Sequence, residues 1–335
     1  MDTASASALI KLLYGSVLKR DPASGEFAHW AGLLERDELN VEQVIRKFHD
    51  SDEYRERQLN GLPVVPAFLD GHYHSPVVDP RTVGPYVAQE RVLDPEQLAG
   101  IQLDALTMRR LWLKNLDFTR RSAFEDQPTP HRRYGYLGGP FPYGDAITLR
   151  MMIRHLGPRR IIEIGSGYST ACMLDTADEL GDYGISITCI DPDTARLRSL
   201  LRPADYDRVT IFERPVQEVL PEIVDTLRAN DLLFIDSTHV LKTGSDVHFE
   251  FFHLLPRLKP GVVVHFHDIL YPFEYPHEWI FDLNYSWNEA YVLRSSYSVE
   301  FWNGLFARKF ANEIREEFPT FMKNPGGSIY LQRVG

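Results

Sequence analysis

Short apolar runs and helical apolar spacings alternate along the C-terminal two-thirds of this 335-residue chain. Apolar runs bounded by turn residues predict strands, and the segments between them predict helices. The five runs are residues 160–164, 185–190, 209–212, 232–235 and 262–266. This alternation predicts a doubly wound, mostly parallel α/β sheet. Two more strand-like segments, 298–302 and 328–331, flank a helix and predict an antiparallel pair at the sheet edge, for seven strands in total.

The first part of the chain differs because its apolar positions follow helical spacing only. Such spacing recurs over residues 9–18, 27–34 and 41–48 and predicts three short helices. Asn40, followed three residues later by a glutamine, is the N-cap that this pattern predicts for the third helix. We therefore expect a small all-α domain over residues 1–61.

Residues 62–130 predict a connector with one helix. Proline and histidine are frequent over 62–95, where apolar residues lack a regular period, and this composition predicts irregular structure. A charged segment over 94–124 has apolar residues at helical spacing and predicts a helix. A loop rich in glycine and proline then leads into the α/β domain, which we expect over residues 131–335.

Composition narrows the range of partners. The formal net charge of −11 argues against nucleic acid, whose phosphates are bound by clustered Lys and Arg. The two cysteines, Cys172 and Cys189, have no metal-ligand spacing and fit a reducing compartment. The sequence shows no secretion signal and no apolar stretch long enough to span a bilayer. We expect a cytoplasmic protein that acts on a small molecule, without membrane attachment.

A glycine-rich turn joins the first predicted strand to the next helix. Its sequence is Glu163-Ile164-Gly165-Ser166-Gly167, and the two glycines let the backbone turn sharply beside a ligand. A dinucleotide site prefers a third glycine, where this chain has Thr170. The Glu163 carboxylate would repel a pyrophosphate and suits a cationic sulfonium. The turn therefore favours S-adenosylmethionine over a nicotinamide dinucleotide.

The ends of later strands extend this cofactor site. Asp191 follows the second strand, where an acidic side chain accepts hydrogen bonds from both ribose hydroxyls. The segment 212–216 follows the third strand, where we expect the adenine. The predicted cofactor-binding residues are Glu163, Gly165, Ser166, Gly167, Asp191, Val216 and Asp236.

These segments resemble the successive motifs of class I S-adenosylmethionine-dependent methyltransferases. The residues that carry the resemblance are 163–167, Asp191, 231–236 and 256–264, in that order along the chain. The resemblance implies the Rossmann-like fold and the methyl-transfer activity of that superfamily. The order of the motifs is similar to the branch associated with O-methylation of small molecules or sugars.

The N-terminal helical segment resembles a short domain of unknown function that is common in bacterial secreted, surface and glycan-related proteins. The residues that carry this resemblance are Tyr14, 18–22, Gly25, Trp30, Leu33, Phe48 and 51–54. Lys19 stands where the usual pattern has glycine. The resemblance implies a module for packing, for contact with a protein partner or for oligomerisation, rather than a catalytic one.

Polar side chains gather after the fourth and fifth predicted strands. Asp236 and His239 follow the fourth strand, and His267 and Asp268 follow the fifth, so adjacent strands would bring them to one edge of the sheet. Methyl transfer to oxygen needs alignment and a base for the acceptor proton. We predict His267 as this base, with Asp236 orienting it. His239 is the second candidate, although it and His265 are equally explained as structural histidines.

A metal site is the alternative use of the same side chains. Some metal-dependent members of the superfamily hold a divalent ion with an aspartate after strand four and an acidic pair after strand five. Asp236 and Asp268 occupy similar positions, whereas His267 replaces the first residue of the pair. Imidazole favours zinc, iron or nickel over magnesium. The resemblance thus leaves open a divalent metal held by Asp236, His267 and Asp268.

Aromatic residues after the fifth strand are candidates for an acceptor pocket, and core packing explains them equally well. These residues are Tyr271, Tyr275, Trp279 and Trp287. The loop over 134–145 precedes the cofactor strand, and its position predicts closure over the methionine end of the cofactor.

We therefore predict an enzyme that transfers a methyl group from S-adenosylmethionine to a hydroxyl of a small molecule, with a sugar or glycan precursor as the class that the resemblance suggests. One alternative is a non-catalytic cofactor-binding or interaction protein that docks through its N-terminal helices. The other is an NAD-linked oxidoreductase, for which the sequence lacks a third loop glycine and a recognisable substrate domain.

Overall fold

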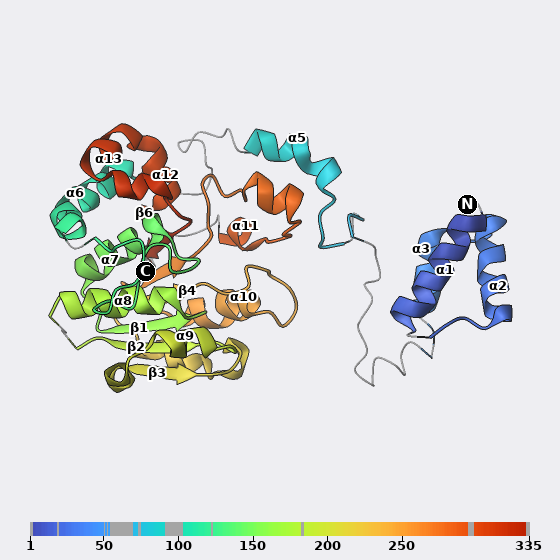
Figure 1. The fold of residues 1–335 in the computed structure, drawn as a ribbon, viewed down its shortest axis with the longest axis horizontal. Coiled ribbons are helices and arrows are strands. Elements are labelled where there is room, and N and C mark those ends of the chain that lie inside the picture. The colour runs from blue at the N-terminus through green and yellow to red at the C-terminus, as the bar shows by residue number, and fades with distance from the viewer. Residues whose placement is uncertain are drawn as a thin grey trace. The chain divides into compact units, whose positions relative to one another are not determined.

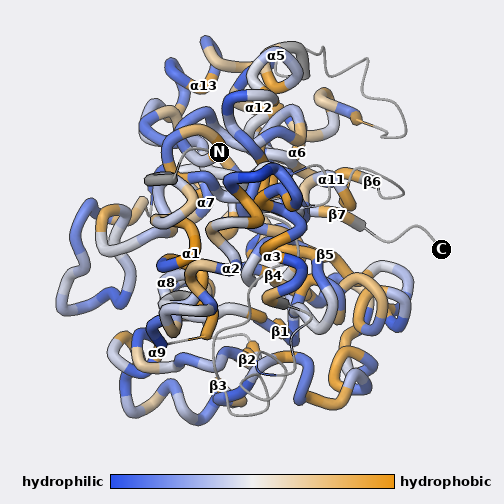
Figure 2. The backbone as a smooth tube through the Cα atoms, turned by 90° about the vertical axis from the view of Figure 1, so that its right-hand side faces the viewer, coloured by the Kyte–Doolittle hydropathy of each residue, from blue (hydrophilic) through white to orange (hydrophobic). Residues whose placement is uncertain are grey.

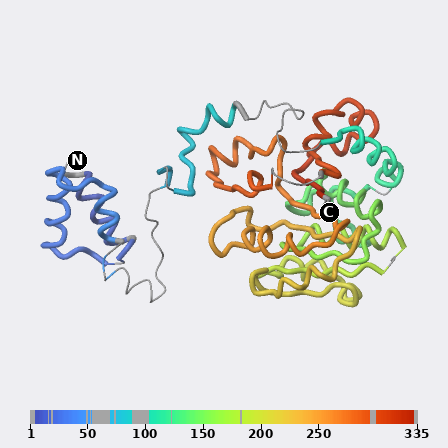
Figure 3. The backbone as a smooth tube through the Cα atoms, turned by 180° about the vertical axis from the view of Figure 1, so that it is seen from behind, coloured from blue at the N-terminus to red at the C-terminus, as the bar shows by residue number. Residues whose placement is uncertain are grey.

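The computed structural model describes residues 3–18, 20–49, 51, 53, 70–72, 75–90, 103–121, 123–181, 184–293 and 298–332. The chain divides into two compact units, Met1–Val83 and Gly84–Gly335, drawn in Figures 1 and 3. Residues 62–69, 73–74 and 91–95 of the predicted connector lie outside the described residues, and so does the predicted start of the helix at residue 94.

The described part of the N-terminal unit contains the three predicted helices, α1 (Thr3–Val17), α2 (Ser24–Glu35) and α3 (Val41–His49). Their inward faces bury one apolar cluster, which includes Ile10, Tyr14, Leu34, Val44 and Phe48. Helix α3 begins with the predicted cap. The N–H of Gln43 donates to Asn40 Oδ1 at 2.9 Å, and the N–H of Asn40 donates to Gln43 Oε1 at 2.9 Å.

A helix lies within the connector where irregular structure was expected. Helix α5 (Pro80–Glu90) contradicts that expectation for the end of the segment 62–95. A proline at the first helical position lacks only an N–H that would have no partner there, and Asp79 caps the turn by accepting a backbone N–H at 3.0 Å. The helix predicted over 94–124 is α6 (Ala105–Arg121) in the described residues.

The described residues of the second unit form a seven-stranded sheet in the order β3-β2-β1-β4-β5-β7-β6. The strands are β1 (Arg160–Ile164), β2 (Ser186–Ile190), β3 (Val209–Phe212), β4 (Leu232–Ile235), β5 (Val263–Phe266), β6 (Ser298–Trp302) and β7 (Ile329–Gln332). Neighbouring strands from β3 to β5 pair in parallel, whereas β7 pairs antiparallel with both β5 and β6. The doubly wound sheet and the antiparallel pair at its edge are thereby confirmed.

Helices pack around this sheet (Figure 1). Helix α6 contacts α7 (Tyr143–Leu156), α7 contacts α8 (Tyr168–Glu179), and α8 contacts α9 (Ala195–Leu200). The other described helices of this unit are α10 (Asp246–Phe249), α11 (Glu289–Leu293), α12 (Asn303–Lys309) and α13 (Ala311–Glu317). Short helical turns cover Pro203–Asp207, Val216–Glu218, Pro221–Thr226, Glu250–Leu254, Leu255–Arg257, Glu278–Asp282 and Pro319–Lys323.

The middle of the sheet is apolar, as the hydropathy colours of Figure 2 show along the central strands. All four residues of β4 are buried hydrophobic side chains. A parallel sheet covered on both faces requires such strands, and it leaves polar chemistry to the strand ends. Within the described part of the chain, no helix is both long enough and apolar enough to cross a membrane.

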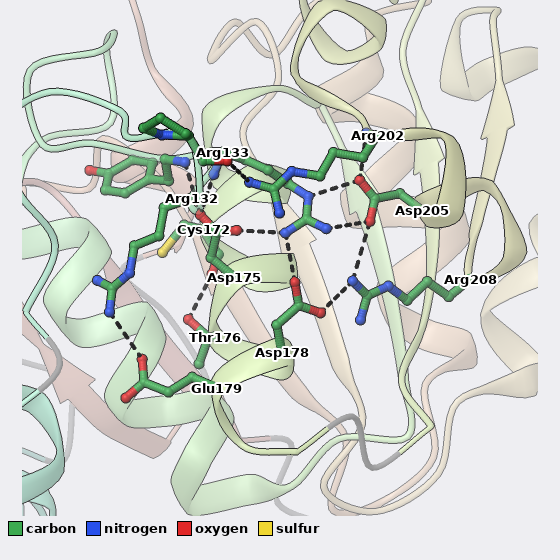
Figure 4. Close-up of polar contacts among 12 residues, drawn as sticks. Arg132, Arg133, Cys172, Asp175, Thr176, Asp178, Glu179, Arg202, Asp205 and Arg208 are labelled. Atoms are coloured by element: carbon green, nitrogen blue, oxygen red, sulfur yellow. Dashed lines mark hydrogen bonds and ion pairs between the residues drawn. The ribbon is translucent and has the colours of Figure 1, made fainter.

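A buried ion-pair network fixes the loop that leads into α7 (Figure 4). The Arg133 side chain is 4% exposed, and its guanidinium pairs with Asp175, Asp178 and Asp205 at 2.6, 2.7 and 2.5 Å. Burial would raise the pKa of the Asp205 carboxyl, but hydrogen bonds from Arg133 outweigh it and hold that pKa below its usual range. Because two of the aspartates belong to α8, the network ties the loop to the helix that follows the glycine turn.

Candidate active site

The glycine turn brings β1 into direct contact with the end of β4. Gly165 has φ of +78°, and a Cβ at this position would overlap the backbone carbonyl of Asp236. Only glycine combines this left-handed conformation with so close an approach. The turn therefore places the predicted cofactor loop beside the first residue of the predicted chemical site.

Two adjoining cavities open at the carboxyl ends of the strands. The larger has a volume of about 500 Å³ and is lined by residues that include Asp191, Val216 and Ser237. The smaller has a volume of about 250 Å³ and is lined by residues that include Gly167, His267 and Asp268. Gly165, Asp191 and Asp236 line both cavities. Cavities of this size are typical of small-molecule and cofactor sites.

Six of the seven predicted cofactor-binding residues line these cavities: Gly165, Ser166, Gly167, Asp191, Val216 and Asp236. Asp191 accepts the N–H of Ser166 at 2.8 Å and the N–H of Asp193 at 2.8 Å, which fixes its carboxylate at the cavity wall. A carboxylate has about four acceptor sites. The third bond to Asp191, from the Ser166 hydroxyl, is long at 3.4 Å, so the carboxylate keeps acceptor capacity for a ribose hydroxyl.

Glu163 lies beneath the turn and lines neither cavity. Its buried carboxylate accepts the Ser169 hydroxyl at 2.6 Å and the Thr170 hydroxyl at 2.5 Å. Burial raises the pKa of Glu163 to about 7, although these two hydrogen bonds lower it. Thr170 also accepts the N–H of Gly167 at 3.1 Å, which explains why a threonine occupies the third glycine position. Glu163 thus holds the first turn of α8, with its carboxylate directed at these two hydroxyls and not at either cavity.

His267, Asp236 and Asp268 form a compact polar cluster after β4 and β5. One donor atom from each of the three lies within 4.8 Å of the others. His267 Nδ1 is 3.4 Å from both Asp236 Oδ1 and Asp268 Oδ1, and its Nε2 is 3.4 Å from Asp145 Oδ2. Burial would lower the pKa of His267, but the surrounding carboxylates raise it well above its usual value. These carboxylates therefore favour the protonated form of the imidazole.

His239 is arranged differently. Its Nδ1 lies 2.9 Å from Glu289 Oε2, and its Nε2 faces Asp268 and Asp236 at 3.6 and 3.7 Å. Burial lowers the pKa of His239, and the hydrogen bond with Glu289 more than compensates, so that the pKa is raised. A histidine oriented by a buried carboxylate, with its other nitrogen directed at the reacting groups, is the usual arrangement of a general base.

Backbone conformation supports a functional reading of this cluster. His239 and Asp268 have φ of +62° and +56°, in the left-handed region that residues other than glycine rarely adopt. Such conformations persist where the surrounding structure enforces them, and they concentrate at active sites.

His265 takes no part in the cluster. It lies on the same side of the sheet as His267, with ring centroids 6.1 Å apart. Its ring stacks on Phe234 at 3.8 Å and lies 4.8 Å from Tyr330. Burial holds the pKa of His265 well below its usual value, so the side chain is a neutral packing group.

The donor atoms of this cluster are of the kinds that bind divalent metals. Neither ring nitrogen of His267 is aligned for a hydrogen bond with a described residue, although both are buried. An unsatisfied imidazole next to two carboxylates is a set of donor atoms suited to a divalent transition metal. Asp236, His267 and Asp268 therefore fit such an ion.

Two buried carboxylates complete this region, and the sequence did not single out either. Asp145 lies in the first turn of α7, and Glu289 begins α11, 50 residues after His239. No local motif marks them, because each reaches its histidine only through the tertiary fold.

The predicted aromatic residues separate into two groups. Trp287 lies 4.3 Å from the His239 ring, and Trp279 and Tyr275 pack on Trp287 at 5.0 and 5.9 Å. Tyr271 instead packs on Trp302 at 5.2 Å. From the loop predicted to cover the cofactor, Pro140 and Phe141 line the smaller cavity.

Comparisons with known proteins agree with this fold and site over part of the chain. Residues 162–269 match a family described as a methyltransferase domain, and residues 2–58 match a domain of unknown function (DUF4214). An uncharacterized protein from Archaeoglobus fulgidus is 28% identical over 173 residues, which are 49% of this chain and 75% of that protein.

Two solved structures are among those to which the chain is similar. A putative O-methyltransferase from Klebsiella pneumoniae has 17% identity and a TM-score of 0.36, covering 76% of this chain and 96% of its own. The O-methyltransferase TomG from Streptomyces achromogenes, in complex with S-adenosylmethionine, has 17% identity and a TM-score of 0.35, covering 70% of this chain and 92% of its own.

Proposed function

We propose that this methyltransferase transfers the methyl group of S-adenosylmethionine to a hydroxyl of a small molecule, with sugars and glycan precursors as the first acceptors to test. The observation that carries the proposal is the position of Asp236, which lines both cavities and belongs to the polar cluster. The cofactor site and the candidate catalytic groups thus meet at one residue.

The cofactor is assigned to the two cavities together. Asp191 would accept the ribose hydroxyls, Val216 would contact the adenine, and the turn Gly165-Ser166-Gly167 would contact the methionine part. This orientation directs the sulfonium toward Asp236 and His267. The position of Pro140 and Phe141 on the smaller cavity supports a role in excluding water there.

A divalent metal is assigned to Asp236, His267 and Asp268. When bound, it would supply positive charge that lowers the pKa of an acceptor hydroxyl. The same three side chains would then orient the acceptor oxygen toward the methyl group. Binding the reactants in line is the main contribution that a protein makes to such a displacement.

His239 takes the base role in this proposal, in place of His267. With the Nδ1 proton shared with Glu289, the Nε2 lone pair of His239 is available for the acceptor proton. The acceptor oxygen forms a bond to the methyl carbon, and the carbon–sulfur bond breaks with its electron pair returning to sulfur. The hydroxyl proton goes to His239.

The remaining parts of the proposal concern the cellular location and the binding partners. The net charge of −11 supports a small-molecule acceptor over nucleic acid. Both cysteines are free and buried, which supports the cytoplasm as the location and no membrane role. We assign the N-terminal helical domain, taken as residues 1–61, to contact with a protein partner or to oligomerisation.

A methyl-transfer assay with labelled S-adenosylmethionine and a panel of sugars, glycan precursors and phenols tests this function. We expect label to enter at least one hydroxylated acceptor, and chelation to stop the transfer until metal is restored. Transfer to nitrogen or carbon nucleophiles alone would contradict the proposal of hydroxyl methylation.

A further inference from the structure

Asp145 uses its two carboxylate oxygens for different purposes. Oδ1 accepts the N–H groups of Gly327 and Ser328 at 3.0 Å each and the Ser328 hydroxyl at 2.5 Å. Oδ2 makes none of these bonds and lies 3.4 Å from His267 Nε2. One oxygen thus fastens the start of β7, and the other faces the imidazole.

The fastening leaves Asp145 little freedom to turn. Its residue is 1% exposed, and Ser328 is fully buried. Gly326, with φ of +74°, passes so close that a Cβ there would overlap the carboxylate of Asp145. The direction of Oδ2 toward His267 is therefore set by the fold and not by a rotamer choice.

His267 stands between Asp145 and the two ligand carboxylates. Its Nε2 faces Asp145, while its Nδ1 faces Asp236 and Asp268. Nε2 and Oδ2 are 3.4 Å apart and are not aligned for a hydrogen bond in this structure. Alignment of the two on metal binding would hold the proton on Nε2 and leave the lone pair on Nδ1. Histidine ligands of metals nearly always have such an outer partner, which fixes the tautomer and raises the basicity of the ligand.

We propose that Asp145 is a positioning residue that holds the proton of His267 on Nε2 and presents Nδ1 as a metal ligand, so that the centre prefers a transition metal over magnesium. This inference rests on the metal site of the proposed function. It goes further by naming the ligating atom, the residue that orients it and the class of metal. Preference for cobalt, iron, nickel or zinc follows from an imidazole in the ligand set, because magnesium selects oxygen ligands.

Asp145→Asn separates the two uses of the side chain. The three donors from Gly327 and Ser328 require an oxygen at Oδ1, so the amide nitrogen must take the place of Oδ2. That nitrogen would donate to His267 Nε2 and move the imidazole proton to Nδ1, where it blocks the metal. We expect the affinity for Co²⁺, measured by its visible absorbance in the full-length protein, to fall about 10- to 100-fold.

Ser328→Ala is the matched control. It removes one bond to Oδ1 and leaves the pairing of Oδ2 with His267 in place. We expect this variant to unfold at a lower temperature and to bind Co²⁺ as the wild type does. Equal Co²⁺ affinity in wild type and in folded Asp145→Asn, or equal losses of affinity in Asp145→Asn and Ser328→Ala, would overturn the positioning role.

A measurement on the wild type covers the case in which Asp145→Asn does not fold. Nuclear magnetic resonance of zinc-loaded protein with nitrogen-labelled histidine should show His267 with a proton on Nε2 and with Nδ1 ligated. The opposite assignment would overturn the proposal, as would displacement of Co²⁺ by an equal concentration of Mg²⁺.

Binding of S-adenosylhomocysteine, measured on the same samples, keeps this inference distinct from the proposed function. Co²⁺ binding that depends on Asp145 without S-adenosylhomocysteine binding would support the inference and remove the cofactor assignment. S-adenosylhomocysteine binding with no Co²⁺ binding in the wild type would overturn the inference and retain the cofactor.

Discussion

The two ends of the active site are built in different ways. At the cofactor end, Gly165, Ser166 and Gly167 are consecutive, and Asp191 follows the adjacent strand. At the catalytic end, the histidines and their carboxylate partners come from α7, the ends of β4 and β5, and α11. Backbone geometry defines the first end, and long-range pairs of side chains define the second.

This difference suggests how each end responds to change. Backbone contacts at the cofactor end depend on glycine conformation and tolerate many neighbouring side chains. Buried pairs at the catalytic end depend on both partners, because removal of one leaves the other unsatisfied in a low-dielectric environment. Substitutions at the catalytic end should therefore separate turnover from cofactor binding.

The largest effect is expected for His239→Ala. Loss of a general base typically reduces turnover about 10²- to 10⁴-fold, while S-adenosylhomocysteine affinity should stay near the wild-type value because His239 lines neither cavity. Steady-state methyl transfer and calorimetry measure the two quantities. The exposed His253→Ala serves as control, and undiminished turnover in His239→Ala would remove the base assignment.

Arg133→Ala tests whether the loop over the smaller cavity is held by the ion-pair network. Asp175 would keep a buried carboxylate without its cation, and Asp205 would keep only Arg208, at 3.2 Å, so we expect a loss of about 3–5 kcal/mol in the free energy of unfolding. Urea denaturation measures this loss. Arg198→Ala, which removes an exposed pair with Glu213 at 2.9 Å, should cost far less stability, because solvent screens exposed ion pairs. Equal losses of unfolding free energy in the two variants would show that the buried network stabilises the fold no more than an exposed ion pair does.

Gly165→Ala tests whether the close backbone approach at the glycine turn defines the cofactor end. Its Cβ would meet the Asp236 carbonyl and force a residue other than glycine into a left-handed conformation. We expect a loss of about 1–3 kcal/mol in stability, together with loss of S-adenosylhomocysteine binding. Thermal unfolding and calorimetry report the two effects. A stable Gly165→Ala protein with wild-type affinity would contradict the close approach of β1 to β4.

The smallest effect concerns Glu163 and pH. Its pKa is about 7 in the fold and near 4.5 otherwise, so its contribution to stability is full below about pH 4.5 and is lost as the pH rises to about 7. Glu163→Gln remains neutral, and its stability should therefore fall by about 1–2 kcal/mol less than that of the wild type between pH 6 and pH 8. Denaturation at the two pH values tests this. If the stability of the two proteins changes with pH in the same way, burial does not destabilise the charged form of Glu163.

The sequence predicted the cofactor end better than the catalytic end, for a physical reason. A turn with two glycines after a buried strand is a local signal, so the positions of Gly165, Gly167 and Asp191 could be expected in advance. The side chain of Glu163 could not, because its direction is decided by hydroxyls on α8 that satisfy a buried carboxylate.

At the catalytic end, strand-end placement predicted that Asp236, His239, His267 and Asp268 would converge, and the structure brings them together. The division of roles between the two histidines was not predictable. It depends on Asp145 and Glu289, whose distances in sequence from their partners carry no periodic signal. Functional residues whose partners lie far away in the sequence can be recognised only from the folded structure.

The most direct test of the proposed cofactor site is calorimetric titration of the full-length protein with S-adenosylhomocysteine and, in parallel, with NADH. We predict that S-adenosylhomocysteine binds, that Gly165→Ala weakens this binding, and that His239→Ala does not affect it. We predict no binding of NADH. Binding of NADH, or of neither ligand by the folded protein, would contradict the assignment of these cavities to S-adenosylmethionine.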